Sequence, residues 1–334
     1  MKPAPFEYSR PADIDEACAL LVADDGARLI AGGQTLVPLM AMRLARPSRL
    51  IDIARILGLA YVREVDATPS AVRPRESGDP GAPVEPVERA ALDSRLRGNE
   101  RGRGFDSNGA SIAIGATTRQ HVVESDPLVQ AKLPLLAKVM PFVGHGATRA
   151  RGTVGGSLAN GDPAAEIVLV AVTLGAMLTW RDGGKSSEIA AADFFIGPMV
   201  TALPLTACLA EARFPVWPER RVGVGFHEVN ARQSDFAFVA AAAQVALDAN
   251  GCCTRAAIGI GAAAAVPLRL DKVAMDLQGK RFEQAKVGEA VTAALAKVET
   301  LADLHASADY RRRVAATLAV RAIADAFAAA ARRA

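Results

Sequence analysis

One run of residues, 149–166, constrains this chain more than any other. It reads RARGTVGGSLANGDPAAE and places a glycine pair, Gly155-Gly156, between the hydroxyl side chains of Thr153 and Ser157. Because glycine lacks a Cβ, it permits positive φ and lets backbone amides come within hydrogen-bonding distance of a phosphate. Asp162-Pro163 then predicts a helix start, with an acid at the cap and proline in the first position. The geometry suits a pyrophosphate.

A second glycine pair, Gly32-Gly33, follows a short apolar strand expected at residues 27–31. Thr35 is predicted to cap a helix over residues 36–44, and Pro38 falls in its first turn, where a missing N–H costs little. Two such loops can hold one dinucleotide from both sides.

The spacing of both pairs disfavours two common nucleotide-binding motifs. Neither pair fits the G-x-G-x-x-G fingerprint of nicotinamide-binding domains, and the chain contains no G-x-x-x-x-G-K-[ST] phosphate loop. A single glycine pair is more often a plain turn than a ligand site. Two glycine pairs, each with a hydroxyl side chain nearby and a predicted helix start after it, favour a ligand site.

Composition bounds the class of protein. The 334 residues are 51% hydrophobic, which is enough to fill the cores of two or three domains. The net charge of +3 is small and the basic residues form no stripe with interleaved aromatics, so no nucleic-acid partner is expected. The apolar run at residues 167–180 is too short for a membrane span, and residues 1–6 lack the apolar segment of a secretory signal. Cytoplasmic placement is the default expectation.

Cysteine and histidine spacing predicts no metal site. The four cysteines and four histidines show no C-x-x-C motif and no other ligand spacing, so we expect no metal bound by this chain alone. Cys18 shares one helical face with Ile14 and Leu21 and is predicted to be a small core residue rather than a reactive thiol.

Apolar periodicity predicts a first lobe over residues 1–56. A helix at residues 13–22 is followed by a strand at 27–31, a helix at 36–44 and a strand at 50–53. This order is typical of a small β-α-β unit.

Residues 57–217 predict a second lobe. Strands at residues 61–65 and 111–115 would form a hairpin around residues 67–108, which are rich in Pro, Gly, Arg and Glu. Such a segment cannot bury enough surface to offset its ordering entropy, so we interpret it as a disordered insertion, either a tolerated loop extension or a partner-docking arm. The lobe is further expected to contain a helix at residues 133–143 and a hairpin of strands at 176–180 and 188–190.

Residues 219–334 follow a different pattern. Strands are expected at residues 222–229, 236–248 and 256–260, and alanine-rich helices continue to the end, as in residues 314–330. A few strands beside a helical layer predict a separate α+β domain.

Several motifs of the chain occur together, and in this order, in one family. The chain resembles the FAD-binding medium subunit of the molybdenum-containing hydroxylases, the group that includes xanthine dehydrogenase and aerobic carbon monoxide dehydrogenase. The resemblance covers nearly the whole chain apart from the insertion. The motifs that carry it are AGGQTLVPL at residues 31–39, LARP at 44–47, IGATT at 114–118, the run at 153–166, DFFIGP at 193–198 and SADYRR at 307–312.

The resemblance implies an α+β fold: the two-lobed FAD-binding fold of the vanillyl-alcohol oxidase and p-cresol methylhydroxylase type, followed by a C-terminal α+β domain with a small antiparallel sheet and helices. FAD would lie between the lobes and the C-terminal domain, with the first glycine loop around its diphosphate. Glu166 would contact the adenosine ribose, Val143 would make an apolar contact, and His227 falls near a position where xanthine dehydrogenase-like members use a lysine. The implied cofactor-binding residues are Leu29, Ile30, Ala31, Gly32, Gly33, Gln34, Thr35, Leu36, Val143, Thr153, Val154, Gly155, Gly156, Ser157, Asp162, Glu166 and His227.

The same resemblance implies an electron-transfer subunit of a heterotrimer, alone or dimerised. A molybdopterin-binding large subunit would hydroxylate the substrate, a small subunit would pass electrons through two [2Fe-2S] clusters to this FAD, and the FAD would pass them to an external acceptor. No catalytic acid-base pair or nucleophile emerges from the sequence, as expected where a cofactor carries the chemistry. Two alternatives stay open: a self-sufficient flavin oxidoreductase of the same fold, and a non-catalytic scaffold protein that has lost FAD.

Overall fold

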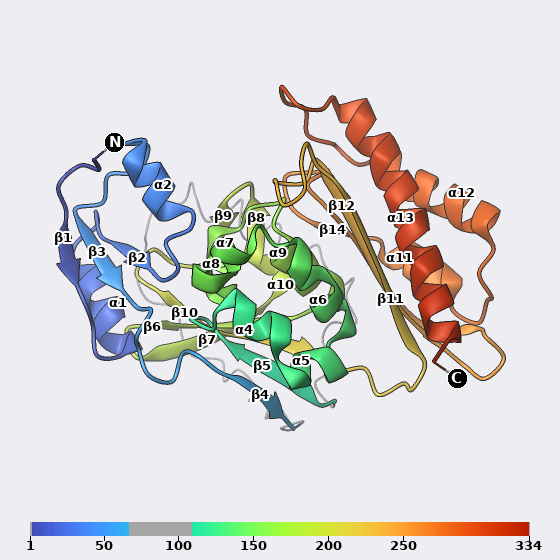
Figure 1. Ribbon diagram of the computed structural model, residues 1–334, viewed down its shortest axis with the longest axis horizontal. Helices are drawn as coiled ribbons and strands as arrows, with labels where there is room; N and C mark the ends of the chain where they lie inside the picture. The colour runs from blue at the N-terminus through green and yellow to red at the C-terminus, as the bar shows by residue number, and fades with distance from the viewer. Residues whose placement is uncertain (1, 67–108, 334) are drawn as a thin grey trace, which may run out of the picture.

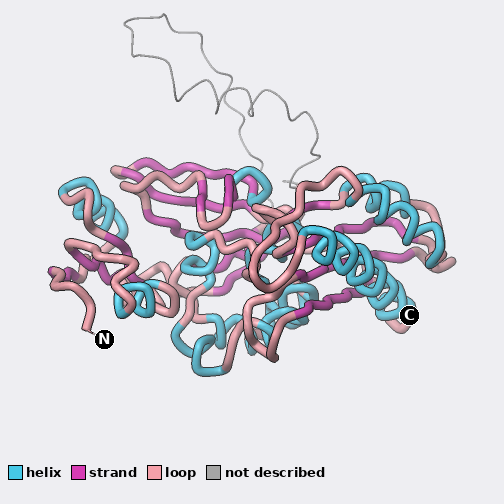
Figure 2. The backbone as a smooth tube through the Cα atoms, turned by 90° about the horizontal axis from the view of Figure 1, so that it is seen from above, coloured by secondary structure: helices cyan, strands magenta, loops and turns pink. Residues whose placement is uncertain are grey.

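The computed structural model describes residues 2–66 and 109–333. Apart from one two-stranded sheet, three β-sheets follow one another along the long axis of the molecule, from the N-terminal end to the C-terminal end (Figure 1). Helices lie between the second and third sheets, and the longest helix covers the far side of the third (Figures 1 and 2). This is the mixed α+β architecture that the sequence predicts. The predicted insertion, residues 67–108, lies outside the described residues.

The N-terminal sheet contains the predicted β-α-β unit. Its elements are β1 (Glu7–Ser9), α1 (Ile14–Ala23), β2 (Arg28–Ile30), α2 (Leu36–Ala41) and β3 (Arg49–Asp52). The strand order is β1-β3-β2 and both pairs are parallel. Asp13 caps α1, since its carboxylate accepts the Glu16 N–H at 2.8 Å. Cys18 lies fully buried in the core of this lobe, as predicted.

One predicted cap is absent. Thr35 precedes α2 with φ −101° and ψ −50°, which is helical rather than extended, and its side chain accepts no hydrogen bond from the first turn. An N-cap residue needs extended backbone so that its oxygen can reach an amide of the first turn. The prediction that Thr35 caps this helix is therefore wrong, and Thr35 instead lines the cavity described below.

The second sheet is antiparallel. Its strands are β4 (Val62–Val65), β5 (Ser111–Gly115), β6 (Met177–Asp182), β7 (Lys185–Ala190) and β10 (Cys208–Pro215), in the order β4-β5-β10-β6-β7. Both predicted hairpins, β4 with β5 and β6 with β7, are present. Gly183 and Gly184 both have positive φ in the β6–β7 turn, the backbone that a two-residue hairpin requires.

Short helices and a small hairpin connect these strands. They are α4 (Gln120–Ser125), α5 (Pro127–Lys132), α6 (Pro134–Val139), a 3₁₀ turn (Met140–Phe142), α7 (Gly146–Arg151), α8 (Val154–Asn160), α9 (Glu166–Leu174), α10 (Ala191–Phe194), β8 (Phe195–Gly197) and β9 (Val200–Thr201). All nine residues of α9 are buried, so this helix forms the centre of the larger core.

Helix α9 begins later than predicted. Its N-cap is Ala165, and the Asp162 carboxylate accepts the Ala164 N–H at 2.9 Å, which closes a turn before the helix. Pro163 therefore lies in that turn, and the prediction of a helix start at Asp162-Pro163 is wrong. An Asx turn and an N-cap use the same side-chain oxygen, so the sequence alone does not separate them.

The third sheet belongs to the predicted C-terminal α+β domain. Its elements are β11 (Val222–Val229), β12 (Val239–Leu247), β13 (Cys253–Gly261), β14 (Leu268–Arg269), α11 (Asp271–Leu277), α12 (Gln284–Leu295) and α13 (Ala308–Ala331). The strands are antiparallel in the order β11-β12-β13-β14. Helix α13 packs on one face of the sheet, and α6 and α9 pack on the other.

Small side chains let helices approach both faces of β12. Ala240 and Ala242 face the larger core that contains α9, whereas Ala241 and Ala243 face α13. The alternation follows from the two-residue period of a strand. The sheet is thereby buried on both sides.

Helix α13 is the one described helix that is long and apolar enough to cross a membrane. Its most apolar window is 44% buried, and it packs along β11 and β12. It is therefore a core helix of the C-terminal domain.

Replacing Gly225 by Ala is expected to destabilise the C-terminal domain, because the new Cβ would lie 2.0 Å from the Ala322 carbonyl oxygen on α13. Overpacking of this kind costs about 1–3 kcal/mol. Gly288→Ala on α12 is the matched control, because nothing lies within 4 Å of its Cβ and helix propensity favours alanine. Urea unfolding compares the two, and equal stabilities would contradict the packing described here.

Candidate functional site

A cavity of about 660 Å³ lies between the first lobe, the helices of the second lobe and the loop that joins β11 to β12. Both glycine pairs line it, as do the carboxyl-bearing residues Asp162 and Glu166. Among the predicted cofactor-binding residues, only Val154 and His227 do not line it. The others are Leu29, Ile30, Ala31, Gly32, Gly33, Gln34, Thr35, Leu36, Val143, Thr153, Gly155, Gly156, Ser157, Asp162 and Glu166.

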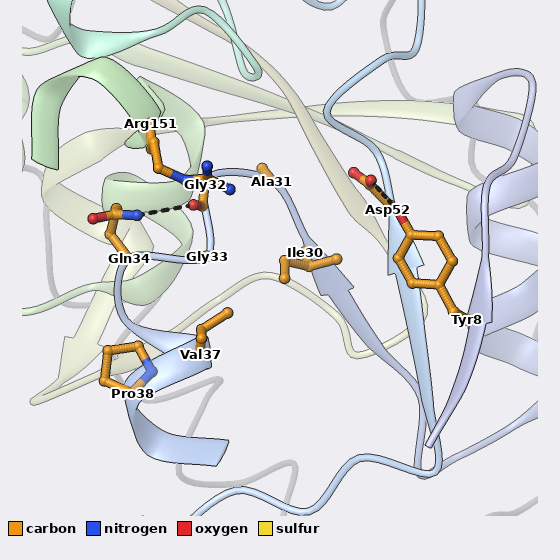
Figure 3. A pocket seen from close by; sticks show the side chains of 10 residues that line it. All are labelled: Tyr8, Ile30, Ala31, Gly32, Gly33, Gln34, Val37, Pro38, Asp52 and Arg151. Atoms are coloured by element: carbon orange, nitrogen blue, oxygen red, sulfur yellow. Dashed lines mark hydrogen bonds between the residues drawn. The ribbon is translucent and has the colours of Figure 1, made fainter. Parts of the chain in front are cut away.

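The first glycine loop offers unused backbone donors. Among the described residues, the N–H groups of residues 32–35 have no hydrogen-bond acceptor. Gly33 has φ +71°, a left-handed conformation that turns the chain between β2 and α2. The Gln34 side chain donates to the Gly32 carbonyl at 3.2 Å and braces the loop (Figure 3). Successive free amides in a turn form an anion-binding concavity.

The two glycine motifs touch through backbone alone. A Cβ on Gly32 would lie 2.5 Å from the Arg151 carbonyl oxygen and 2.8 Å from the Gly152 Cα. Figure 3 shows Arg151 beside Gly32 at this contact. Any larger residue at Gly32 would push the two lobes apart, so this contact sets the width of the cavity.

The second glycine pair lies in a helix rather than an open loop. Thr153 caps α8, and its hydroxyl accepts the Gly156 N–H at 3.0 Å. The Gly155 N–H donates to the Ala116 carbonyl at 2.9 Å, and the Ser157 N–H donates to the Thr153 carbonyl at 3.1 Å. These amides are occupied, so the expectation that they are free to bind a phosphate is wrong for this pair.

The two glycines of this pair differ in what surrounds them. A Cβ on Gly155 would lie 2.5 Å from the Ala116 side chain, so this position lets α8 pack against the end of β5. A Cβ on Gly156 would meet only Thr153 Oγ1, at 2.7 Å, and Gly156 is exposed. Gly156 is therefore the position at which a ligand can touch bare backbone. Val154 is fully buried beneath the helix, which explains why it does not line the cavity.

Strand β11 turns His227 away from the cavity. Gly225 and His227 lie on the face of β11 that packs against α13, where His227 Nε2 is 2.9 Å from Asp325 Oδ2. Phe226 lies on the opposite face, in the larger core, and Glu228 shares that face. The structure therefore does not support His227 as a cofactor-binding residue.

Arg149 holds the wall that carries Val143. Its guanidinium pairs with both carboxylate oxygens of Glu124, at 2.7 and 3.1 Å. It also donates to the carbonyls of Gly144, at 2.8 Å, and Val143, at 3.2 Å. A bidentate pair with further carbonyl acceptors fixes geometry as well as adding energy. The apolar side chain of Val143 is thereby held at the cavity.

Three carboxyl groups lie in or near the cavity, and none of them forms an ion pair with a basic side chain of the described residues. Burial raises the pKa of Glu166 to about 8, and Glu228 and Asp162 raise it further by repulsion. Burial also raises the pKa of Glu228, to about 7, and that of Asp162. Glu166 is only 8% exposed, so a ligand is the natural partner for its carboxyl group. In residues 2–66 and 109–333, no three His, Cys, Asp or Glu side chains form a metal-ligating cluster.

Sequence reasoning missed part of the lining. The loop between β11 and β12 contributes residues that no motif marks, and only the three-dimensional packing of the C-terminal sheet brings them here. Gln120 reaches the site because its backbone N–H donates to the Gly152 carbonyl at 2.9 Å, a pairing across the fold. The missed residues include Ala116, Gln120, His145, Thr148, Asn160, Ser234, Asp235 and Phe236.

A smaller cavity of about 450 Å³ shares the first glycine loop with the large one (Figure 3). At one side of it the Tyr8 hydroxyl donates to the Asp52 carboxylate, next to the carboxyl ends of β2 and β3. The glycine loop therefore lines two cavities.

Replacing Glu166 by Gln is expected to stabilise the cofactor-free protein at pH 8 and to change little at pH 5. Between the ordinary pKa of 4.5 and the folded-state value of about 8, the unfolded chain has lost a proton that the folded chain keeps, so stability falls as pH rises. The gain at pH 8 is on the order of 1–3 kcal/mol. Urea unfolding at both pH values measures it. The exposed Glu283 gives the control variant Glu283→Gln, and an equal effect of Glu166→Gln at the two pH values would contradict the prediction.

Comparison with known proteins identifies the family. Residues 4–68 and 101–217 match the family described as "FAD binding domain in molybdopterin dehydrogenase". Residues 225–326 match the "CO dehydrogenase flavoprotein C-terminal domain". Together the two matches span both glycine motifs and the C-terminal sheet.

Individual relatives are similar over nearly their whole length. The alpha subunit of the 6-hydroxypseudooxynicotine dehydrogenase complex of Paenarthrobacter nicotinovorans is 30% identical over 98% of this chain and 96% of its own. The carbon monoxide dehydrogenase medium chain of Afipia carboxidovorans is 30% identical over 97% of both chains. The solved carbon monoxide dehydrogenase of Hydrogenophaga pseudoflava superposes with a TM-score of 0.81 at 29% identity, covering 98% of this chain and 99% of that one. The chain therefore belongs to the FAD-binding medium subunits of the molybdenum hydroxylases, an oxidoreductase family, and FAD is its cofactor.

Proposed function

We propose that this chain holds FAD in the large cavity and carries electrons from [2Fe-2S] clusters on a small partner subunit to an external acceptor. A molybdopterin-binding large subunit of the same complex would oxidise the substrate. Two relatives support this organisation by their names, one as a subunit of a dehydrogenase complex and one as a medium chain. We infer the same division of labour here, in a heterotrimer, alone or dimerised, in the cytoplasm.

One observation carries the proposed placement of FAD. The free N–H groups of residues 32–35 lie on one side of the cavity, and the exposed backbone of Gly156 lies on another. A diphosphate needs several donors and close approach to backbone, and this pair of motifs supplies both. The residues present therefore fit a dinucleotide.

Other lining residues would position the rest of the cofactor. Ser157 offers a hydroxyl next to Gly156, and Val143 offers an apolar surface. Glu166 is protonated at neutral pH, since its pKa is about 8, and can donate a hydrogen bond to an oxygen or nitrogen of the ligand. When bound, FAD supplies the electron carrier, while this chain binds and orients it.

We infer domain boundaries at residues 1–56, 57–217 and 219–334. With these boundaries, each of the two lobes contains one glycine motif, and the C-terminal domain contributes the β11–β12 loop that also lines the cavity. The two alternatives, a self-sufficient flavin oxidoreductase and a scaffold that has lost FAD, gain no support from the described residues. A scaffold would have no need for a row of unused amides at a cavity.

Replacing Gly156 by Val is expected to lower FAD affinity by about tenfold or more, because the side chain would occupy the exposed surface where the ligand approaches backbone. The measurement is FAD bound per chain after purification, with the released cofactor identified. Gly288→Val is the matched control, because its site on α12 is open.

The folded state of Gly156→Val is checked by circular dichroism. A folded variant with FAD content equal to that of the parent chain would contradict the proposed site. A parent chain that neither contains FAD nor binds added FAD would contradict the proposed function and favour the scaffold alternative.

A further inference from the structure

Arg151 brings a positive charge to the first glycine loop from the other lobe. It is the last residue of α7, and it lines the smaller cavity together with Gly32, Gly33 and Gln34. Figure 3 shows its side chain extending from α7 toward Gly32. The Arg151 side chain and the free N–H groups of residues 32–34 therefore lie at one cavity.

The backbone of Arg151 is fixed at the point where the two lobes touch. Its carbonyl oxygen would lie 2.5 Å from a Cβ on Gly32, so the two backbones are in direct contact. The same carbonyl accepts a hydrogen bond from the Arg119 guanidinium. The side chain of Arg151 therefore starts from a fixed point beside the loop, and only its own rotamers decide how it meets a ligand.

The Arg151 guanidinium has no partner among the described residues. The nearby Arg149 pairs with Glu124, whereas the one polar side-chain contact of Arg151 is made by its carbonyl oxygen. The carboxyl group that shares the smaller cavity, Asp52, is already engaged, because the Tyr8 hydroxyl donates to it and the guanidinium of Arg10 lies 3.9 Å away. The charge of Arg151 is therefore available to a ligand.

The other arginine at the two cavities is not available in this way. Arg28 and Arg151 are the arginines among the described residues that line the cavities, and no described lysine lines either of them. The Arg28 guanidinium donates to the carbonyls of Asp25, at 3.1 Å, and Ala27, at 2.6 Å. Arg151 is therefore the cation at the cavities with unused donors.

Charge also favours the first glycine loop over the rest of the lining as the place for a diphosphate. The carboxyl-bearing residues Asp162, Glu166 and Asp235 line the large cavity, and an ionised carboxyl group repels a phosphate. The loop offers amide donors and the Arg151 guanidinium. A guanidinium presents two parallel N–H donors that match two phosphate oxygens.

We propose that Arg151 is a cofactor-binding residue whose guanidinium pairs with the diphosphate of FAD at the first glycine loop. The inference rests on the proposed function, because it requires that FAD binds at this loop. It adds a residue of the second lobe to a group of donors that the first lobe supplies, so the bound diphosphate would join the two lobes by charge as well as by backbone contact.

A dependence on salt follows from this pairing. Arg151 is exposed, so dissolved ions screen its attraction for a phosphate. The hydrogen bonds of the loop amides and the apolar contacts of the cavity depend much less on salt. The part of the FAD affinity that Arg151 supplies is therefore expected to be large at low salt and small at high salt.

The experiment measures the Kd of FAD for the full chain, after removal of bound cofactor, by quenching of flavin fluorescence at about 0.02 M and about 0.5 M salt. Arg151→Gln is expected to weaken binding about tenfold at low salt, because a charge-assisted pair is lost. At high salt the loss is expected to shrink to about threefold or less. Arg55→Gln removes an exposed arginine of the first lobe that lines neither cavity, and this control should match the parent chain at both salt concentrations.

A second variant separates charge from shape. Arg151→Lys keeps the positive charge and loses the two parallel donors, so its affinity is expected to lie between those of the parent chain and Arg151→Gln, with the salt dependence of the parent chain. An Arg151→Lys variant as weak as Arg151→Gln at low salt would overturn the pairing with a phosphate charge.

The remaining outcomes distinguish this inference from the proposed function. A parent chain that binds no FAD contradicts the proposed function itself. A parent chain that binds FAD as tightly as Arg151→Gln leaves the proposed function standing and overturns the role of Arg151, as does a loss of equal size at both salt concentrations, which indicates a change of cavity shape. If Arg151→Gln does not fold by circular dichroism, the parent chain alone decides, because an FAD affinity that does not change with salt also overturns the role of Arg151.

Discussion

The contact between Gly32 and the backbone of Arg151 and Gly152 is the constraint on which the rest of the site depends. It joins the first lobe to the second with no side chain between them. The amides of residues 32–35 are therefore held at a fixed distance from α8, and this spacing creates the cavity. Residues 34 and 35 are exposed, so an anion can replace water on these amides, and the same contact that orders the loop also prepares it for an anion.

The carboxyl groups in and near the cavity also lower the stability of the protein without a ligand, once they ionise. Burial raises the pKa of Glu166 and of Glu228, which means that each ionised form is destabilised in the fold. Natural proteins accept such costs where function requires them. A bound ligand restores stability by mass action, so the cofactor is expected to be part of the stability of this chain as well as its function.

Most elements were predictable from the sequence because their signals are local. The turn at Gly183-Gly184 and the β-α-β unit of the first lobe follow from turn chemistry and apolar period. The caps were less predictable. Thr35 and Asp162 are good capping residues by type, but the first has helical backbone and the second closes a turn, and residue type alone does not separate these outcomes from a cap.

The candidate site also has features that the sequence predicted and features that it did not. Both glycine motifs were predicted, yet the use of their amides was not, because Gly155 donates to Ala116, a partner some forty residues away in sequence. His227 was predicted to bind the cofactor, yet its ring pairs with Asp325 on α13, and its neighbour Phe226 packs on the opposite side of the sheet. A shift of one residue on a strand reverses the face, and a position taken from family resemblance does not fix that register.

The C-terminal domain is also a structural part of the cavity, through a chain of hydrogen bonds. Arg311 on α13 is buried and donates to the Ala262 carbonyl at 2.9 Å. The Ala262 N–H in turn donates to the Pro163 carbonyl at 2.8 Å, in the turn that carries Asp162. Because α13 also packs tightly on Gly225, the helix, the sheet and the Asp162 turn hold one another in place. The part of the cavity wall that carries Asp162 is therefore connected, through the end of β13, to a helix on the far side of the sheet.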